Sequence, residues 1–158
     1  MPLPKCVVVK KIEDGPVGWR HIGTRVTYSG NLYRRPDDSV RREMGKNVWY
    51  LAREIKWSGR LWRDSRIDAL HETKVWLRKQ TAYVIGKYPA AFGVFEEGTI
   101  KLIGAHPAAA GLGLAERIIR HVGGQITAGT YEDNEAARGL YKKLGMKEIR
   151  REEVFHEN

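Results

Sequence analysis

The chain has 158 residues, 42% of them hydrophobic, which is the size and composition of one ordinary globular domain. No segment approaches the run of about 18 apolar residues that spans a membrane, and no long apolar stretch near the N-terminus predicts a signal peptide. The single cysteine, Cys6, excludes an intramolecular disulfide, and the five histidines are too scattered to predict a metal site. We therefore expect a cytoplasmic protein that binds no metal.

Positive charge is concentrated in the first half of the chain. The net charge is +9, and residues 1–80 contain 18 Lys and Arg against 9 Asp and Glu, whereas residues 81–158 contain 10 of each. A basic surface attracts anionic ligands such as nucleotide sugars or nucleic acids over long distances. An ordinary solvated surface is the alternative, and composition alone does not choose between the two.

The N-terminal residues indicate short elements separated by turns. The apolar run Cys6–Val9 predicts a buried first strand, and Glu-Asp-Gly-Pro at residues 13–16 predicts a turn. Residues 25–28 predict a short strand that ends in a turn at residues 29–31.

Residues 34–57 give weaker signals. Residues 34–46 are the most polar stretch, which predicts an exposed loop or a short helix capped by Asp38 or Ser39. Residues 47–57 are compatible with a strand or a helix, and their aromatic and β-branched side chains favour a strand.

A helix is predicted over residues 64–79, with Asp64 or Ser65 as its cap. Four side chains on or near it could hold or deprotonate an amine, although solvated helix residues are the commoner case: Asp64, Asp68, His71 and Glu72. Four tryptophans lie in this basic part of the chain: Trp49, Trp57, Trp62 and Trp76. They could stack on bases or sugar rings, but we favour core packing for two or three of them.

Three antiparallel strands are predicted in succession at residues 82–85, at residues 90–95 and from Thr99 onward, because short turns join them. A helix ending at Gly123-Gly124 follows the third strand. It leads to a strand at residues 125–130 that should run parallel to the third.

The C-terminal part predicts a helix and a final strand. Asp133 or Asn134 is the expected helix cap, and Gly145 ends the helix. Its apolar stripe has helical spacing and consists of Ala137, Leu140, Tyr141 and Leu144. Residues 147–155 predict the final strand.

The clearest functional signal is the loop between the third strand and its helix. Gly111 and Gly113 follow Pro107 and stand at the helix entrance, and the expected apolar stripe comprises Leu112, Ala115, Ile118, Ile119 and Val122. The first amides of a helix lack partners within it, and the helix dipole makes that end positive. Glycines there predict a cradle for phosphate, and for a pyrophosphate above all. An ordinary turn is the alternative, since the spacing matches neither a P-loop nor the dinucleotide Gly-x-Gly-x-x-Gly.

This segment resembles motif A of the GNAT superfamily of N-acetyltransferases. There the loop reads Gln/Arg-x-x-Gly-x-Gly/Ala, follows a strand with a Pro-containing turn, and binds the pyrophosphate of CoA. Gly113 and Ala115 match this pattern, whereas Ala110 stands where the family usually has Arg or Gln. The departure removes one side-chain contact to phosphate and leaves the backbone cradle.

A second stretch resembles the same family more specifically. The family pattern is Asn-x-x-Ala-x-x-Leu-Tyr-x-x-x-Gly-Phe. Matching positions here are Asn134, Ala137, Leu140, Tyr141 and Gly145, and Met146 replaces the Phe. Two linked motifs in the correct order are much less frequent by chance than either alone. Together the resemblance covers residues 82–155.

The resemblance implies an α/β (α+β) fold with a mixed, mostly antiparallel sheet, helices on both faces, and a parallel strand pair at an acetyl-CoA site. It implies one domain over residues 1–158, with residues 1–80 as the acceptor side and residues 81–158 as the acetyl-CoA-binding core. The residues that it implies for acetyl-CoA binding are Ala105, His106, Ala110, Gly111, Leu112, Gly113, Leu114, Ala115 and Asn134.

The resemblance also implies roles in direct acyl transfer. Tyr141 takes the place of the family's general acid to the leaving thiolate, and Asn134 that of the residue that orders the pantetheine arm. A backbone amide near Ala105 would polarise the thioester carbonyl. The base remains open, with four candidates: His106, Asp68, Glu72 and His156.

The resulting prediction is an N-acetyltransferase that uses acetyl-CoA and acts on a small, anionic primary amine. Residues 128–130 and 153–156 resemble the branch of the family that acetylates nucleotide-linked amino sugars. Two alternatives are an enzyme that acetylates nucleic acid or a nucleic-acid-associated protein, and a non-catalytic binding module, which the missing Arg or Gln at Ala110 would suit. No membrane partner is expected. A homodimer is compatible with the family, which is often dimeric.

Overall fold

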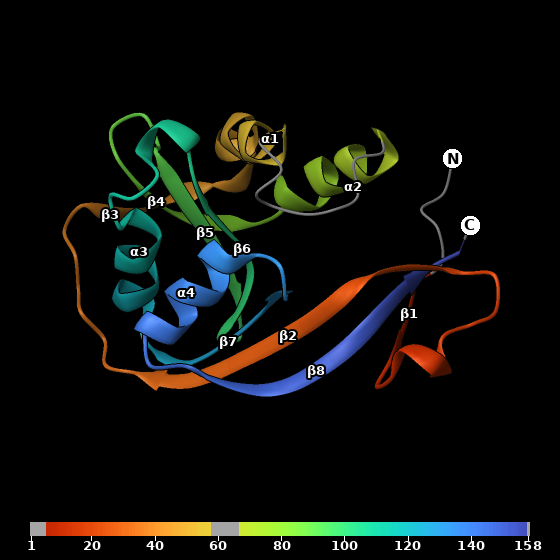
Figure 1. Ribbon diagram of the computed structural model, residues 1–158. Coiled ribbons are helices and arrows are strands. Elements are labelled where there is room, and N and C mark those ends of the chain that lie inside the picture. The colour runs from red at the N-terminus through yellow and green to blue at the C-terminus, as the bar shows by residue number, and fades with distance from the viewer. Residues whose placement is uncertain (1–5, 58–66, 158) are drawn as a thin grey trace. The chain divides into compact units, whose positions relative to one another are not determined.

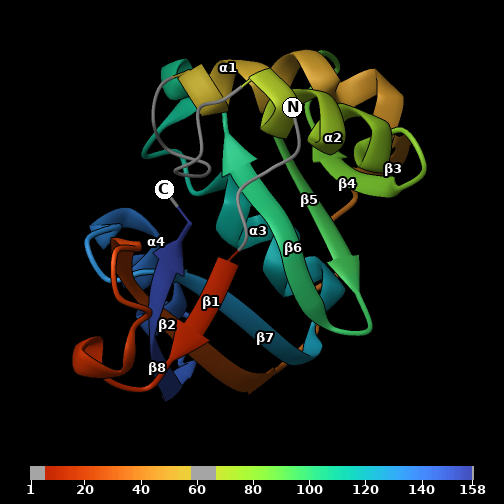
Figure 2. The same cartoon turned by 90° about the vertical axis from the view of Figure 1, so that its right-hand side faces the viewer.

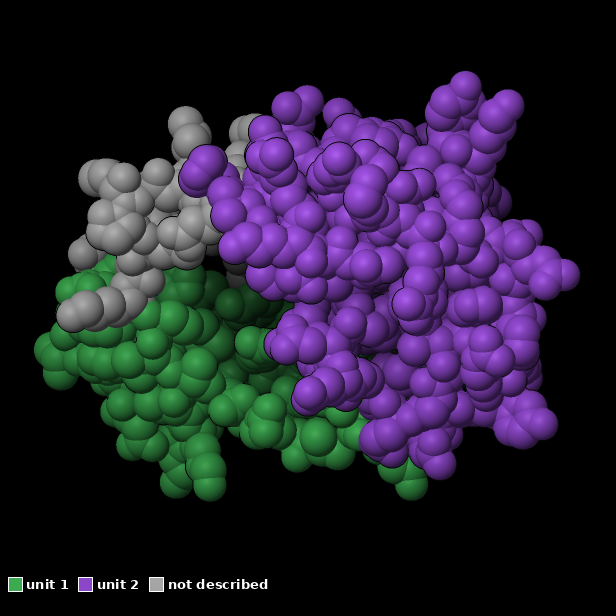
Figure 3. Space-filling model, turned by 180° about the vertical axis from the view of Figure 1, so that it is seen from behind, with its two compact units in different colours: residues 1–30, 127–158 green, residues 31–126 purple. Residues whose placement is uncertain are grey.

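The structure is a computed structural model that describes residues 6–57 and 67–157, without the side chains of residues 55–57, 67–70 and 72 (Figure 1). Its internal contacts divide the chain into two compact units (Figure 3). Unit 1 comprises residues 1–30 and 127–158, and unit 2 comprises residues 31–126. Within the described ranges, no helix is long and apolar enough to cross a membrane.

Eight strands follow one another in the order β1-β8-β2-β7-β6-β5-β4-β3. In chain order they are β1 (Cys6–Val9), β2 (Arg20–Leu32), β3 (Val40–Met44), β4 (Thr81–Ile85), β5 (Ala91–Glu96), β6 (Thr99–Ala105), β7 (Gly124–Tyr131) and β8 (Lys147–His156). The pairs β1–β8, β2–β8, β3–β4, β4–β5 and β5–β6 are antiparallel. Strands β6 and β7 form the parallel pair, so the predicted fold class is confirmed.

In unit 1, helix α4 (Glu135–Lys143) packs on β2 through two aromatic rings. Val26 and Tyr28 lie two residues apart on one face of β2, and both are fully buried. The ring of Tyr28 lies 5.6 Å from the ring of Tyr141 on α4. Leu144, which follows α4, is also buried, as the predicted helix stripe requires.

In unit 2, the sheet has a core on each face. Helices α1 (Trp49–Trp57) and α2 (Ile67–Leu77) contribute Leu51 and Leu77 to a core that also holds Phe92 of β5. Helix α3 (Leu114–Val122) contributes Ile118 to the core on the opposite face, which includes Ala91. Because neighbouring residues of β5 point to opposite faces, one strand serves both cores. Figure 2 shows α1 and α2 on the near side of β5 and β6, with α3 behind these strands.

Helix α1 and strand β3 differ from the predictions. Residues 49–57 form a helix, although their side chains favour a strand, because helical geometry buries Leu51 and Ala52 in the core beside Val48. The polar stretch at residues 34–46 contains β3, which is neither a loop nor a helix. Arg41 and Arg42 are exposed on this edge strand, where charged side chains are common.

The predictions for the first two strands were partly wrong. Residues 6–9 do form β1, but the strand lies at the end of the strand order, and Val8 is 44% exposed instead of buried. Strand β2 is 13 residues long and continues through the turn predicted at residues 29–31. It is long because it pairs with β8, from the other end of the chain, over most of its length.

Candidate active site

The loop between β6 and α3 begins at a histidine cap. The Nδ1 atom of His106 accepts a hydrogen bond from the amide of Ala108 at 3.0 Å, which fixes the 3₁₀ turn Pro107–Ala109. Gly111 and Gly113 follow with φ angles of +84° and +72°, in the left-handed region that favours glycine. Helix α3 begins at the next residue, so both glycines stand where the sequence predicts them.

The glycine loop is open above its backbone. A Cβ atom built on Gly111 or Gly113 would meet no atom within 4 Å. The amides of Leu114 and Ala115 belong to the first turn of α3, where they have no partner inside the helix. The open space, the first-turn amides and the positive end of the helix dipole together suit an anion.

Leu112 takes less part in packing than the predicted helical stripe requires, and Ala110 is exposed beside it. The side chain of Leu112 is 67% exposed and precedes α3, so the buried stripe of this helix rests on Ile118 and Ile119 instead. Ala110 is exposed, and its amide donates to the carbonyl of Pro107 at 3.2 Å. Neither side chain supplies a polar group to the loop.

Residues 35–37, which precede β3, form hydrogen bonds to α3. Arg117 of α3 makes two hydrogen bonds to the Asp37 carboxylate, at 2.7 and 3.0 Å, and they lower the pKa of Asp37 below its ordinary value. The amide of Asp37 donates to Nδ1 of His121 at 2.9 Å, and the amide of Arg35 donates to the carbonyl of Arg120 at 2.8 Å. These bonds reach the middle and the end of α3 and so fix the helix that carries the loop.

The amide of Ala105 is directed away from β5. Ala105 lies opposite Ala91, and the amide of His106 donates to the carbonyl of Ala90 at 2.8 Å. In an antiparallel pair, this bond makes Ala91 and Ala105 a non-hydrogen-bonded pair, whose own amides point outward. The amide of Ala105 is therefore on the side of β6 opposite β5, as a role in polarising a carbonyl requires.

In unit 1, Asn134 caps α4. Its side-chain oxygen accepts a hydrogen bond from the amide of Ala137 at 3.2 Å, so Asn134, of the two predicted candidates, is the cap. The side-chain NH₂ group remains as the polar group that Asn134 could offer to a ligand.

Tyr141 lies buried on the face of α4 that packs on β2. The residue is 2% exposed, and burial raises the pKa of its hydroxyl to about 12. Its ring packs on the ring of Tyr28, with centroids 5.6 Å apart.

Arg138 links Tyr28 to the start of α4. Its Nε atom donates to the Tyr28 hydroxyl at 3.1 Å, and its Nη1 atom donates to the Glu132 carbonyl at 3.0 Å. This arginine orients the ring on which Tyr141 packs.

The structure describes the side chains of two of the four candidate bases, His106 and His156. His106 uses Nδ1 in its cap and retains Nε2, and His156 lies opposite both Cys6 and Arg20 in neighbouring strands. The side chains of Trp57, Asp68 and Glu72 are not described, and Trp62, Asp64 and Ser65 lie outside the described residues.

A cluster that the sequence did not reveal joins His21, Thr24 and Glu153. The Glu153 carboxylate lies 2.9 Å from Nε2 of His21 and accepts the Thr24 hydroxyl at 2.9 Å. Glu153 is more than 120 residues away in sequence, so no local motif could indicate the contact. Among the described residues, no group of three His, Cys, Asp or Glu side chains is arranged to hold a metal ion.

Comparisons with known proteins identify the fold. No protein-family model matches the sequence, and no curated protein matches it either. An acetyltransferase assigned to the GNAT family from Novosphingobium aromaticivorans has a similar structure, with a TM-score of 0.66 and 18% identity over 95% of this chain and 71% of that one. A conserved protein of unknown function from Staphylococcus epidermidis has a TM-score of 0.65 and 13% identity over 90% of this chain and 64% of its own.

A GCN5-related N-acetyltransferase from Sphaerobacter thermophilus also matches, with a TM-score of 0.51 and 14% identity over 87% of this chain and 52% of its own length. The chain thus spans between about half and 71% of the length of these three proteins. Their shared arrangement of strands and helices shows that this chain has the fold of the GNAT-family N-acetyltransferases.

Proposed function

We propose that the chain is an acetyl-CoA-dependent N-acetyltransferase. The observation that carries this proposal is the open glycine loop at the start of α3, where two left-handed glycines leave the first-turn amides accessible. A pyrophosphate is the ligand class that suits such a loop. The loop would hold it through backbone amides alone, since Ala110 supplies no cation.

The reaction that we propose is direct acyl transfer. The acceptor nitrogen attacks the thioester carbonyl, the C–N bond forms, the C–S bond breaks with its electron pair on sulfur, and the nitrogen gives one proton to a base or a chain of water molecules. The amide of Ala105 would stabilise the carbonyl oxygen as negative charge develops on it. Asn134 would contact the pantetheine arm through its NH₂ group, which the helix cap leaves available.

Tyr141 would donate a hydrogen bond from its hydroxyl to the departing sulfur. A pKa of about 12 keeps this hydroxyl protonated at neutral pH, as a donor must be. An ordinary thiol has a pKa of about 8.5, so complete transfer from such a tyrosine is uphill. Tyr141 thus acts mainly by hydrogen-bonding the sulfur as it leaves.

The acceptor that we propose is a small anionic primary amine, with a nucleotide-linked amino sugar as the leading example. Residues 31–126 contain 17 Lys and Arg against 10 Asp and Glu, which supports an anionic partner. Electrostatic attraction of this kind acts mainly on the association rate and weakens with salt.

The test is release of free thiol from acetyl-CoA in the presence of amines. A nucleotide-linked amino sugar, the same amino sugar without its nucleotide, and a single-stranded oligonucleotide would be compared at low and moderate salt. We expect transfer to the nucleotide-linked sugar, and a loss of at least tenfold in kcat for Tyr141→Phe with acetyl-CoA affinity unchanged. Tyr88→Phe is the matched control, because Tyr88 is 81% exposed. Equal turnover in the wild type and Tyr141→Phe would remove Tyr141 from the mechanism.

A further inference from the structure

A bulge in β2 directs two side chains toward the same carboxylate. In the β2–β8 register, His21 lies opposite Phe155, Gly23 opposite Val154 and Thr24 opposite Glu153, with a shift between His21 and Gly23. The extra residue lets His21 and Thr24 both reach Glu153. Such bulges commonly redirect side chains at functional sites.

The contacts of the cluster are specific. Thr24 Oγ1 lies 2.9 Å from each carboxylate oxygen of Glu153, and Nε2 of His21 lies 2.9 Å from Oε2. The Glu153 side chain is only 13% exposed, whereas that of His21 is 35% exposed. A nearly buried carboxylate therefore holds an imidazole that remains open to solvent.

This geometry fixes the tautomer of His21. An ionised carboxylate only accepts hydrogen bonds, so Nε2 must carry the hydrogen. In the neutral ring, Nδ1 then has the free lone pair, which is the arrangement of a histidine base oriented by a carboxylate. The His21 ring also packs on Phe155, with centroids 5.0 Å apart, which limits its rotation.

Two further charged groups face this cluster: the Glu132 carboxylate, whose pKa the Thr24 side chain helps to lower, and Arg151. The neighbouring strand β1 presents Val9 opposite Glu153 and Val7 opposite Phe155. The nearest cation along the same face of β8 is Arg151, which is engaged by Glu132 at 2.9 Å and by Glu148. Because Arg151 is engaged by Glu132 and Glu148, His21 is the ionisable partner that the described residues place directly against Glu153.

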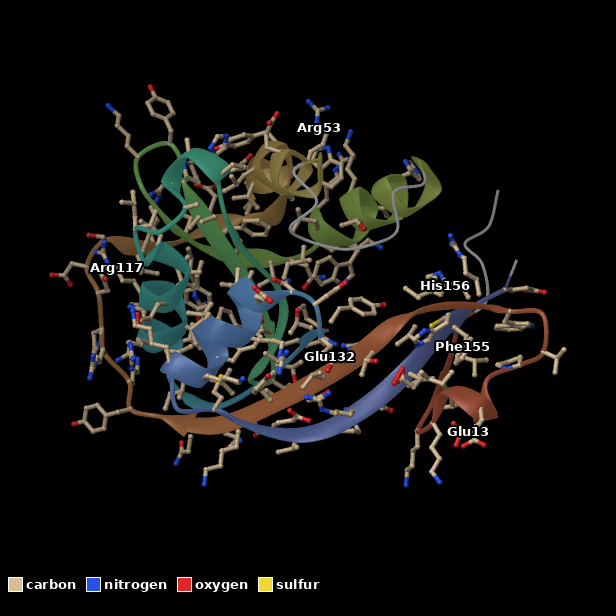
Figure 4. All side chains as sticks on the ribbon, viewed as in Figure 1. Glu13, Arg53, Arg117, Glu132, Phe155 and His156 are labelled. Carbon is tan, nitrogen blue, oxygen red and sulfur yellow. The ribbon has the colours of Figure 1, made fainter. Side chains whose placement is uncertain are left out.

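The cluster lies beside the end of β7 within unit 1. The carbonyl of Thr24 accepts the amide of Glu132 at 2.8 Å, one residue after β7 and two before Asn134. Arg151 is the main cause of the lowered pKa of Glu132, and Thr24 contributes through its side chain. Figure 4 labels Glu132 beside the long β2–β8 strand pair and Phe155 farther along it.

We propose that Nδ1 of His21 accepts the proton of the acceptor amine, directly or through one water molecule. The inference rests on the proposed acetyl transfer. As the C–N bond forms and the electron pair of the C–S bond leaves with sulfur, the proton moves from nitrogen to Nδ1. The Glu153 carboxylate stabilises the resulting imidazolium, which later returns the proton to solvent. Thr24 and Glu153 are positioning residues.

The test compares the pH dependence of kcat/KM for the wild type, His21→Ala and Glu153→Gln. General-base catalysis is worth about 10²–10⁴-fold, so we expect His21→Ala to lose about 100-fold or more and to lose the acidic limb of the profile. Glu153→Gln keeps the shape of the side chain but no longer fixes the tautomer of His21. We therefore expect its kcat/KM to fall at least tenfold and the acidic limb of its pH profile to shift. Glu152→Gln is the matched control, because Glu152 is the adjacent residue of β8 and pairs with Arg150 instead.

The outcomes separate this inference from the proposed function. Wild-type transfer with an unchanged acidic limb in His21→Ala would overturn the role of His21 alone. The role of His21 would also be overturned if the acidic limb of the profile were lost in His156→Ala or His106→Ala and kept in His21→Ala. No transfer by the wild type to any amine would contradict the proposed function and, with it, this inference. Nitrogen-15 NMR of the imidazoles gives an independent check: a hydrogen on Nδ1 of neutral His21 would overturn the assignment.

Discussion

Tyr141 suits both a core position and the role that we propose for it. Its ring packs against Tyr28, and the residue is 2% exposed, so it fits the apolar stripe of α4. A tyrosine can bury its ring and still present its hydroxyl to a ligand, and the packed ring fixes where the hydroxyl points.

Burial of Tyr141 predicts a loss of stability at alkaline pH. Its pKa is raised from 10 to about 12 in the folded chain, so the unfolded chain loses this proton first as the pH rises. Stability from this group is therefore complete below pH 10 and declines between about pH 10 and 12, by up to about 3 kcal/mol. Urea unfolding from pH 8 to 12 should show this decline in the wild type and a smaller one in Tyr141→Phe. Parallel curves for the two proteins would contradict the effect.

Some of the candidate residues can be identified from the sequence and others cannot. Asn134 and Tyr141 can be identified because they match a family pattern whose residues are spaced along one helix. His21, Thr24 and Glu153 are not, because their contact joins strands from the two ends of the chain and depends on a one-residue bulge. No periodic pattern records the position of such a bulge.

At the scale of elements, α3 is fixed along its length and left open at its start. Asp37 and Arg35 bind its middle and C-terminal end, and Ile118 and Ile119 are fully buried. The N-terminus faces open space at Gly111 and Gly113. A rigid helix with an accessible first turn can present its amides to a ligand without reorganising.

The cap of α4 makes a separate prediction. Asn134→Ala removes the hydrogen bond to the amide of Ala137 and should cost about 1 kcal/mol of stability. Asn134→Asp keeps a good cap but loses the NH₂ donor, so it should retain stability and bind acetyl-CoA more weakly. Asn31→Ala, at an exposed position of β2, is the control. Unfolding in urea measures the stability of each variant, and titration measures its affinity for acetyl-CoA. If Asn134→Ala and Asn134→Asp lost stability and affinity to the same extent, the side-chain oxygen and the NH₂ group would not have the separate roles that we assign to them.

The sequence predicted elements best where local signals decide the structure. Strands β4 to β8 and helices α3 and α4 stand where turns, caps and periodicity place them. The side chains of residues 47–57 favoured a strand over a helix, and the chain forms helix α1 there because tertiary packing overrides that local preference. Strand β2 is longer than predicted because β8, which is distant in sequence, supplies its partner.

At the scale of the molecule, the two compact units do not coincide with the two halves of the sequence. Unit 1 combines the first 30 residues with the last 32, and β2 and β8 pair within it. The glycine loop belongs to unit 2, whereas Asn134, Tyr141 and His21 belong to unit 1. That residues 1–80 form the acceptor side remains a prediction.

The central claim, that the glycine loop binds acetyl-CoA, is most directly tested by calorimetric titration of three proteins. Gly113 and Gly124 both have left-handed φ angles, +72° and +79°, and a Cβ on either would meet no atom within 4 Å. Alanine at each should therefore cost a similar strain of about 1–2 kcal/mol. We predict saturable binding by the wild type, at least tenfold weaker binding by Gly113→Ala, and unchanged binding by Gly124→Ala. No binding by the wild type, or equal effects of the two variants, would contradict the account.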